Sequence, residues 1–347
     1  MSTALSARIA RAPKPLAQGL LTTATVFLLA SVLTFGLGAL SSSNPGAAVL
    51  GDTATPADIA RMNHQFGLDR PLPVQFVSWL GHALHGDLGR SWFTTVPVAQ
   101  SVWQALPVDL SVAGLALLMA VALGGAGGIA AALSNGGKVD RAVTAVCAVL
   151  GTLPAFVIAI GLIAVVSVQL GALPSGGYVP FGQDPVQWLR FSLLPAFALS
   201  LEAAAAIARQ LRTSLVGALR ENYVTGAAMR GLSSRRVLFG HVLRNAAGPA
   251  LTVLGMSVPM LIGGAVVTER IFNLPGIAQL ALQAAQEHDV PVVQGTLLVT
   301  TGVVLIANLA VNAGLAALNP AARRGRKGAA GAPGAPVAVG LPEGATV

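Results

Sequence analysis

Long apolar segments alternate with short polar ones along the chain. A helix needs about 20 apolar residues to cross the hydrocarbon core of a bilayer. Six segments reach this length, at roughly residues 17–40, 106–133, 142–170, 190–212, 250–269 and 292–318. This pattern predicts an all-α integral membrane protein with six transmembrane helices.

The composition agrees with a membrane protein. Hydrophobic residues make up 54% of the chain and charged residues only 10%, whereas a soluble domain carries about a quarter charged residues. Cys147, the single cysteine, lies in an apolar run. A lone cysteine excludes an intramolecular disulfide and a metal site built from cysteines.

The apolar segments also divide the chain into regions. We expect an N-terminal tail (1–16), a first transmembrane helix (17–40), an external region (41–105), a transmembrane domain (106–318) that contains a polar loop (214–249), and a C-terminal tail (319–347). In the external region, helical apolar spacing broken by proline and glycine predicts short helices at the outer mouth. The last region is mostly Gly, Ala, Pro and Val, which predicts disorder.

The first segment has the basic start and small residues of a secretory signal. Its apolar stretch is longer than the roughly 7 to 15 residues of a typical signal peptide. We therefore expect an uncleaved membrane anchor.

The basic residues indicate the orientation. Sixteen of the 21 lysines and arginines fall on the side of the two termini, the second-to-third loop and the polar loop, and five fall on the other. Basic residues gather in cytoplasmic loops of membrane proteins, so both termini are expected in the cytoplasm. The net charge of +8 is thus a topology signal and does not indicate nucleic acid binding.

The polar loop contains the segment "GAAMRGLSSRRVLFGHVLRNAAGP". We expect a short helix that ends before Gly231, because glycine suits the left-handed residue that follows a helix. Ser233 or Ser234 then caps a second helix, which places Leu238, Val242 and Ala246 on one stripe. These apolar residues must be buried against the membrane, other helices or a partner protein. The alternative is a solvated loop whose arginines only set the topology.

Here the chain resembles a known family. "YVTGAAMRGLSSRRVLFGHVLRNAAGPALT" is similar to the cytoplasmic loop of membrane-spanning subunits of ATP-binding-cassette (ABC) importers, in the dipeptide/oligopeptide/nickel permease family. "ATPADIARMNHQFGLDRPLPVQFVSWL", "GDLGRSW" and "FNLPGIAQLALQAAQEHDVPVVQG" extend the resemblance over roughly residues 17–320. It implies the type I ABC importer permease fold and a place in the bacterial inner membrane.

In that family the loop forms coupling helices, which dock on the ATPase subunit. The resemblance therefore implies an ATPase-docking role for eleven residues: Thr225, Gly226, Ala227, Arg230, Gly231, Leu232, Ser233, Arg235, Arg236, His241 and Arg244. The general permease signature has a glutamate where this chain has Thr225 and a proline where it has Arg244. Such a departure from the signature is common in the peptide branch of the family.

The resemblance also implies the partners. These are a homologous permease subunit, two ABC ATPase subunits, an external solute-binding protein and membrane lipid. The chain has no Walker sequence, so it is expected to be non-catalytic, with no cofactor of its own and with ATP and Mg²⁺ on the ATPase subunits. The expected cargo is a di- or oligopeptide, with nickel or another small solute as the alternative.

A few other residues carry candidate chemistry. Glu202 lies within the fourth segment, where a charge is costly, and indicates either a wall of the translocation path or a structural carboxyl. Asp109 is expected to reach interfacial water. His82 and His85 are three residues apart, a spacing that can place two metal ligands on one helix face. No third ligand lies near them in the sequence, so we expect surface histidines rather than a metal site.

Prolines and glycines within the segments predict local geometry. Pro154, Pro195 and Pro259 are expected to kink their helices. The glycines of "LGGAGG" (123–128) permit close helix contact.

Two functions of other classes stay open on these residues alone. An ion-coupled secondary carrier with Glu202 and Asp109 as a proton relay predicts an inverted repeat, and the sequence has no visible internal repeat. A membrane scaffold that does not transport would use the apolar loop to dock a different partner.

Overall fold

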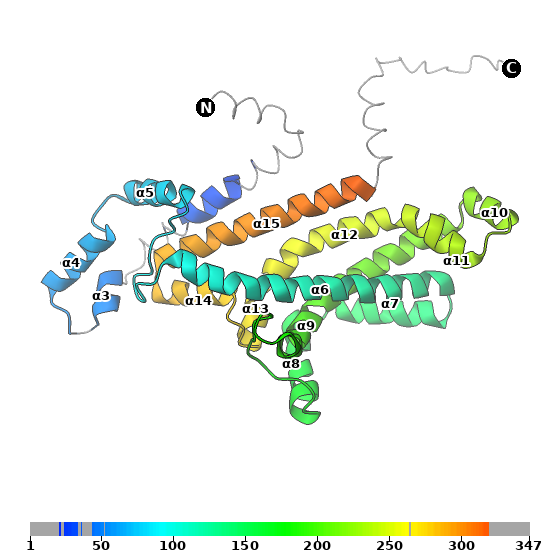
Figure 1. Ribbon diagram of the computed structural model, residues 1–347, viewed down its shortest axis with the longest axis horizontal. Coiled ribbons are helices and arrows are strands. Elements are labelled where there is room, and N and C mark those ends of the chain that lie inside the picture. The colour runs from blue at the N-terminus through cyan, green and yellow to red at the C-terminus, as the bar shows by residue number, and fades with distance from the viewer. Residues whose placement is uncertain are drawn as a thin grey trace, which may run out of the picture.

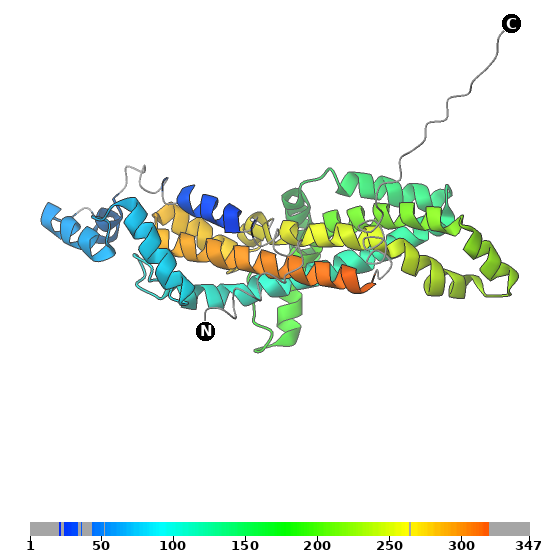
Figure 2. The same ribbon diagram turned by 90° about the horizontal axis from the view of Figure 1, so that it is seen from above.

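The computed structural model describes residues 21, 24–33, 36, 44–51, 53–263 and 265–318. Within these residues the regular structure is helical, with a single isolated bridge between Arg90 and Pro97. The molecule is elongated: the short helices α3 to α5 lie at one end, and α10 and α11 lie at the other (Figures 1 and 2). The expected tails, 1–16 and 319–347, lie outside the described residues. The all-α prediction is confirmed.

Four long helices run along the molecule, namely α6 (Val98–Ser134), α9 (Pro185–Leu219), α12 (Leu243–Gly263) and α15 (Val290–Leu318). By length and hydropathy, four stretches of the described chain can cross a membrane, the third of which joins α12 to the helical turns before it as Ser234–Leu261. The second predicted segment begins eight residues earlier than expected, at Val98. Helix α9 continues through Pro195 and α12 through Pro259.

The third predicted segment is a bent pair. Helix α7 (Lys138–Leu150) is followed by α8 (Ala155–Leu162) and the π-helical η1 (Ile163–Gln169), and the two parts meet at 102°. The break ends at Pro154, directly before α8, as expected for a residue that has no backbone N–H and restricts its predecessor. Counting this pair as one span gives five.

The first predicted segment is described only in part. A ten-residue apolar helix covers Ala24–Leu33. It packs on α15, where the buried amide of Gln294 donates to the carbonyl oxygen of Ser31 at 3.2 Å. The remainder of the predicted helix 17–40 lies outside the described residues, apart from Leu21 and Gly36.

Small residues form the contact between α6 and α9. A Cβ on Gly124 would lie 2.7 Å from the carbonyl oxygen of Ala204, and a Cβ on Gly128 would lie 2.9 Å from that of Ala208. The backbones therefore approach more closely than any larger residue permits, which confirms the prediction made from the glycines of residues 123–128.

At the end of the molecule opposite α10 and α11, three short helices precede α6. These are α3 (Pro45–Leu50), α4 (Pro56–Phe66) and α5 (Leu72–Leu84), as the proline and glycine breaks predicted. Thr55 and Asp58 form a capping box at the start of α4. Two further short helices, α13 (Ala265–Ile271) and α14 (Ile277–Glu287), connect α12 to α15.

A turn over residues 90–97 docks on the junction of α14 and α15. The hydroxyl of Ser91 donates to the carboxyl of Asp289 at 2.5 Å, and the backbone N–H of Trp92 donates to the same carboxyl at 3.3 Å. The indole of Trp92 stacks on Phe66 of α4, with ring centroids 5.1 Å apart. The turn thus connects short helix α4 to the junction of α14 and α15.

Candidate functional site

The polar loop folds into a helical hairpin at the end of the molecule opposite helices α3 to α5 (Figure 1). It comprises α10 (Asn222–Met229), α11 (Ser234–Val237) and the π-helical η2 (Leu238–Val242), which leads directly into α12. Gly231 has a φ of 79°, the left-handed conformation predicted for it. Ser233 occupies the N-cap position of α11, but no side-chain hydrogen bond caps that helix, contrary to expectation. Helix α9 runs to Leu219, so the first residues of the expected loop belong to the long helix.

One face of the hairpin is buried within the chain itself. Ala227, Val237, Leu238, Val242 and Ala246 pack with Leu211 and Leu215 of α9 and with Ala132 of α6. The stripe of Leu238, Val242 and Ala246 is therefore as predicted. Helices α6 and α9 cover it, so this stripe does not by itself require a partner.

The other face of the hairpin is solvent-exposed. Thr225, Arg230, Gly231, Ser233, Arg235, Arg236, His241 and Arg244 are exposed, while Gly226 and Leu232 are half-buried and only Ala227 is buried. Within the described residues, none of these four arginines forms an ion pair. The structure thus brings ten of the eleven candidate residues to the accessible or half-accessible part of one hairpin.

Two large apolar side chains that the sequence analysis did not single out share this exposed face. Met229 is 81% exposed and Phe239 is 58% exposed. Phe239 directly follows Leu238 of the apolar stripe, so periodicity alone did not separate it from its buried neighbours. Exposed apolar residues among unpaired arginines are typical of a surface that binds a protein.

An ion pair fixes the helix that carries the hairpin. The guanidinium of Arg212 on α9 donates two hydrogen bonds, of 2.8 and 2.7 Å, to the carboxyl of Asp140 on α7, which also accepts from the backbone N–H of Gly136. Three residues earlier, Arg209 donates to the carbonyl oxygen of Cys147 at 2.7 Å. Helices α7 and α9 are therefore held together at two points along α7, with defined geometry at the ion pair.

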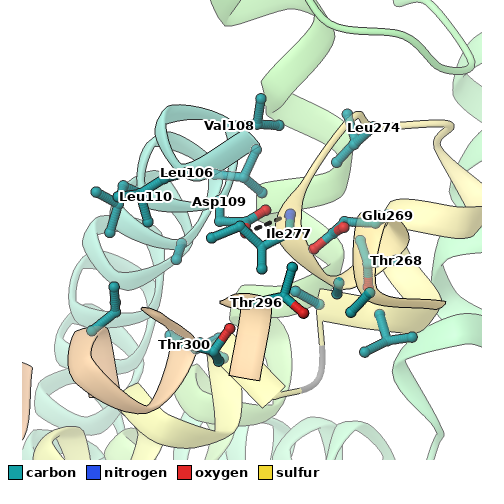
Figure 3. Close-up of a pocket in the computed structure, with 18 of the residues that line it drawn as sticks. Leu106, Val108, Asp109, Leu110, Thr268, Glu269, Leu274, Ile277, Thr296 and Thr300 are labelled. Atoms are coloured by element: carbon teal, nitrogen blue, oxygen red, sulfur yellow. Dashed lines mark hydrogen bonds between the residues drawn. The ribbon is translucent and has the colours of Figure 1, made fainter. Parts of the chain in front are cut away.

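A second site lies away from the hairpin. Helices α6, α13, α14 and α15 supply most of the lining of a cavity of about 570 Å³, α9 and α12 supply the rest, and the lining is almost entirely apolar. Its polar residues include Asp109 on α6 and Glu269 on α13, with three threonines, Thr268, Thr296 and Thr300. Figure 3 shows the two carboxyl groups converging on Ile277, at the start of α14.

The two carboxyls cap α14 from outside. Asp109 Oδ2 accepts from the backbone N–H of Ile277 at 2.9 Å, and Glu269 Oε2 accepts from that of Gln279 at 2.8 Å. Negative charge at a helix N-terminus is stabilised by the free N–H groups and the helix dipole. The N-cap residue, Gly276, has no side chain of its own, and a Cβ there would overlap both carboxyl groups. Asp109 is therefore engaged inside the molecule, and the expectation that it reaches interfacial water was wrong.

Comparisons with known proteins identify the family. The model of the "Binding-protein-dependent transport system inner membrane component" family matches residues 124–324, and the model of its N-terminal part matches residues 14–113. The chain belongs to this family. It is a multi-pass membrane permease of an ABC importer, and the resemblance described above is confirmed.

Curated relatives of this permease match along most of their length. The "Probable peptide ABC transporter permease protein y4tP" of Sinorhizobium fredii is 38% identical over 88% of this chain and 97% of its own. The glutathione transport permease GsiC of Salmonella choleraesuis is 35% identical over 85% of this chain and 94% of its own. The metal-staphylopine import permease CntB of Staphylococcus aureus is 34% identical over 86% of this chain and 95% of its own.

The fold of the permease also matches a solved structure. An inward-facing structure of the MetNI methionine ABC transporter contains a chain with a TM-score of 0.52 and 16% identity, covering 64% of this chain and 95% of that one. At this identity the similarity is one of fold, and it confirms the type I importer architecture.

Family membership excludes the two alternative functions, the ion-coupled secondary carrier and the membrane scaffold. The structure agrees with this: Glu202 is exposed on α9 and does not line the cavity that contains Asp109. His82 and His85 are exposed, and each ring bonds a backbone carbonyl four residues earlier, of Ser78 and Gly81.

Proposed function

We propose that this permease is the non-catalytic membrane subunit of an ATP-driven importer of peptides or similar small solutes. The observation that carries the proposal is the inner hairpin, which buries its apolar stripe against α6 and α9 while it exposes its arginines, Met229 and Phe239. A rigid surface of this kind, continuous with the membrane-spanning stretch Ser234–Leu261, is suited to transmit movement of a bound protein to the helices.

The bound protein is proposed to be the ATPase. Arg230, Arg235 and Arg236 would face acidic or carbonyl groups of its docking surface, with Met229 and Phe239 as apolar anchors. Two ATPase subunits bind ATP and Mg²⁺, because the permease chain has no phosphate-binding sequence. Closure of the ATPase pair on ATP would pull the hairpins together, and hydrolysis would reset them.

The proposed orientation follows the basic residues. The hairpin and both termini lie in the cytoplasm, and helices α3 to α5 lie outside, where a solute-binding protein delivers cargo. A homologous permease pairs with this one in the bacterial inner membrane to enclose the pathway. Large apolar side chains such as Leu118, Met256 and Met260 are exposed on the long helices, where lipid or the second permease would cover them.

The relatives support the proposed cargo class. Their names refer to peptides, glutathione and a metal-staphylopine complex, of which the first two are amino-acid chains. A metal complex is therefore the second candidate cargo.

The test is co-purification of the ATPase with the permease from membranes. An Arg235→Glu, Arg236→Glu variant is compared with the native chain and with Arg70→Glu, a charge reversal of an exposed arginine at the opposite end. We expect at least tenfold less ATPase on the hairpin variant and unchanged amounts on the control, since removing charged contacts from a protein interface costs about 2 kcal/mol or more.

Membrane insertion and thermal stability of all three forms are measured in parallel. Native-like values for the hairpin variant assign its loss of ATPase to docking. Equal recovery of the ATPase with all three forms would contradict the proposed site.

A further inference from the structure

The cavity between α6, α13, α14 and α15 has one polar wall. Each of its two carboxyls uses one oxygen to cap α14, and the other oxygens, Asp109 Oδ1 and Glu269 Oε1, are buried and accept no hydrogen bond from an N–H or hydroxyl group of the described residues. Glu269 is only 2% exposed and lines the cavity. A buried carboxylate oxygen that accepts nothing is costly.

The two carboxyl groups also lie against each other. Both border the point that a Cβ on Gly276 would occupy. Two negative charges this close in an apolar cavity repel strongly, so the pair requires a proton or a cation between its free oxygens. The described part of the chain does not supply the cation, because its ion pairs all lie elsewhere.

The geometry points to a binding site for an ammonium group, and we infer that this cavity receives the N-terminal ammonium of an amine-bearing peptide. The inference rests on the proposed function and specifies the cargo. An ammonium has three donors: Asp109 Oδ1 and Glu269 Oε1 accept two, and a threonine hydroxyl such as that of Thr296, which already donates to the Val292 carbonyl, retains lone pairs for a third.

The remainder of the cavity suits the rest of such a molecule. Its apolar lining includes Leu106, Leu110, Leu117 and Leu282 (Figure 3 labels the first two). About 570 Å³ lies within the roughly 300 to 1,000 Å³ of typical small-molecule sites. Three residues of its lining, Leu110 and Gly114 on α6 and Val266 on α13, are exposed, so the cavity is not closed off from the surface.

A metal ion fits the cavity less well. Within the described residues, no group of three or more His, Cys, Asp or Glu side chains is placed to hold one. Divalent cations take four or more ligands, whereas two free carboxyl oxygens match the compact ammonium of an amine.

The experiment measures equilibrium binding to the complete transporter, purified with its ATPase and partner permease in nanodiscs. The probes are leucyl-alanine and N-acetyl-leucyl-alanine, which differ in the ammonium group. Glu269→Gln and Asp109→Asn each keep an oxygen to cap α14 and lose the charge. Glu287→Gln, at the other end of α14, is the matched control.

We expect leucyl-alanine to bind the native transporter at least tenfold more tightly than its acetylated form, since hydrogen bonds to charged groups contribute on the order of 1.5–3 kcal/mol. Glu269→Gln and Asp109→Asn should each abolish this preference, and Glu287→Gln should keep it. Equal binding of the two probes to the native transporter, or a preference that survives in Glu269→Gln, overturns the inference.

The comparison of probes on the native protein needs no variant, so a folding defect in Glu269→Gln does not remove the test. Retention of the ATPase is scored on the same samples. Equal binding of the two probes to the native transporter with the ATPase still bound rejects the cavity site alone, whereas failure of the ATPase to bind the native chain rejects the proposed function.

Discussion

Two glycines set the distance between α6 and α9. At Gly124 the nearest atoms to an added Cβ are the Ala204 carbonyl oxygen at 2.7 Å and the Ile207 Cβ at 2.9 Å, so the two helix backbones would have to separate. Gly125 is adjacent on the same helix, yet an added Cβ there meets nothing within 4 Å. The two positions therefore separate helix packing from helix propensity.

We predict that Gly124→Ala lowers the stability of the permease by about 1–3 kcal/mol, the usual cost of overpacking. Gly125→Ala should leave stability unchanged or raise it by up to about 1 kcal/mol, because alanine favours the helix. Thermal unfolding of both variants in the same detergent is the measurement. Equal midpoints for the two variants would mean that α6 and α9 are not in close contact.

Between helices, the Asp140–Arg212 ion pair joins α7 to α9. Asp140 is buried and Arg212 is half-buried. Removing one partner of such a pair leaves a charge without compensation, whereas removing both does not. The loss of stability should therefore depend on whether one partner of the ion pair or both are removed.

We predict that Arg212→Met lowers the unfolding temperature more than the double variant Asp140→Asn, Arg212→Met. The double-mutant cycle, measured on the purified permease, gives the coupling between the two side chains. If the double variant is the less stable of the two, α7 and α9 are held by other contacts.

We expect the contact of Asp289 with the turn over residues 90–97 to respond to pH. Burial raises the pKa of Asp289 above its ordinary 3.8, and hydrogen bonds from Ser91 and Trp92 act in the opposite direction. The folded state thus holds the proton more tightly than the unfolded state. Its stabilising effect is complete below the ordinary value and is lost as pH rises through the higher pKa of the folded state.

Hydrogen exchange of the Trp92, Phe93 and Thr94 amides tests this. We predict that their protection, corrected for the intrinsic pH dependence of exchange, decreases as pH rises above about 4. In Asp289→Asn the protection should no longer follow pH over that range. A pH dependence of the same size in Asp289→Asn would assign the effect to another group.

Across the full chain, the features that the sequence predicts are the local ones. Apolar length gives the long helices, Pro154 gives the break before α8, and Gly231 gives the turn of the hairpin. The hydrogen bond between Asp109 and Ile277 and the Asp140–Arg212 ion pair join residues 168 and 72 positions apart, which no spacing along one helix reveals. Burial of the hairpin stripe likewise depends on α6 and α9. The sequence therefore predicted the apolar stripe but not the helices that bury it.

The two proposed sites lie at different ends of the long helices, which permits a separation of their effects. The hairpin leads through η2 and α12 to α13, which carries Glu269, so the two sites share one continuous run of helices.

Substitutions at either end should abolish transport in proteoliposomes, but for different reasons. We predict that Arg235→Glu, Arg236→Glu releases the ATPase and leaves the affinity for leucyl-alanine within about twofold of native, because no contact in the cavity changes. Glu269→Gln should show the reverse, with the ATPase retained and the peptide bound at least tenfold more weakly. If the hairpin variant also loses the peptide, the cavity forms only when the ATPase holds the helices in place, and docking and cargo binding are then a single coupled equilibrium.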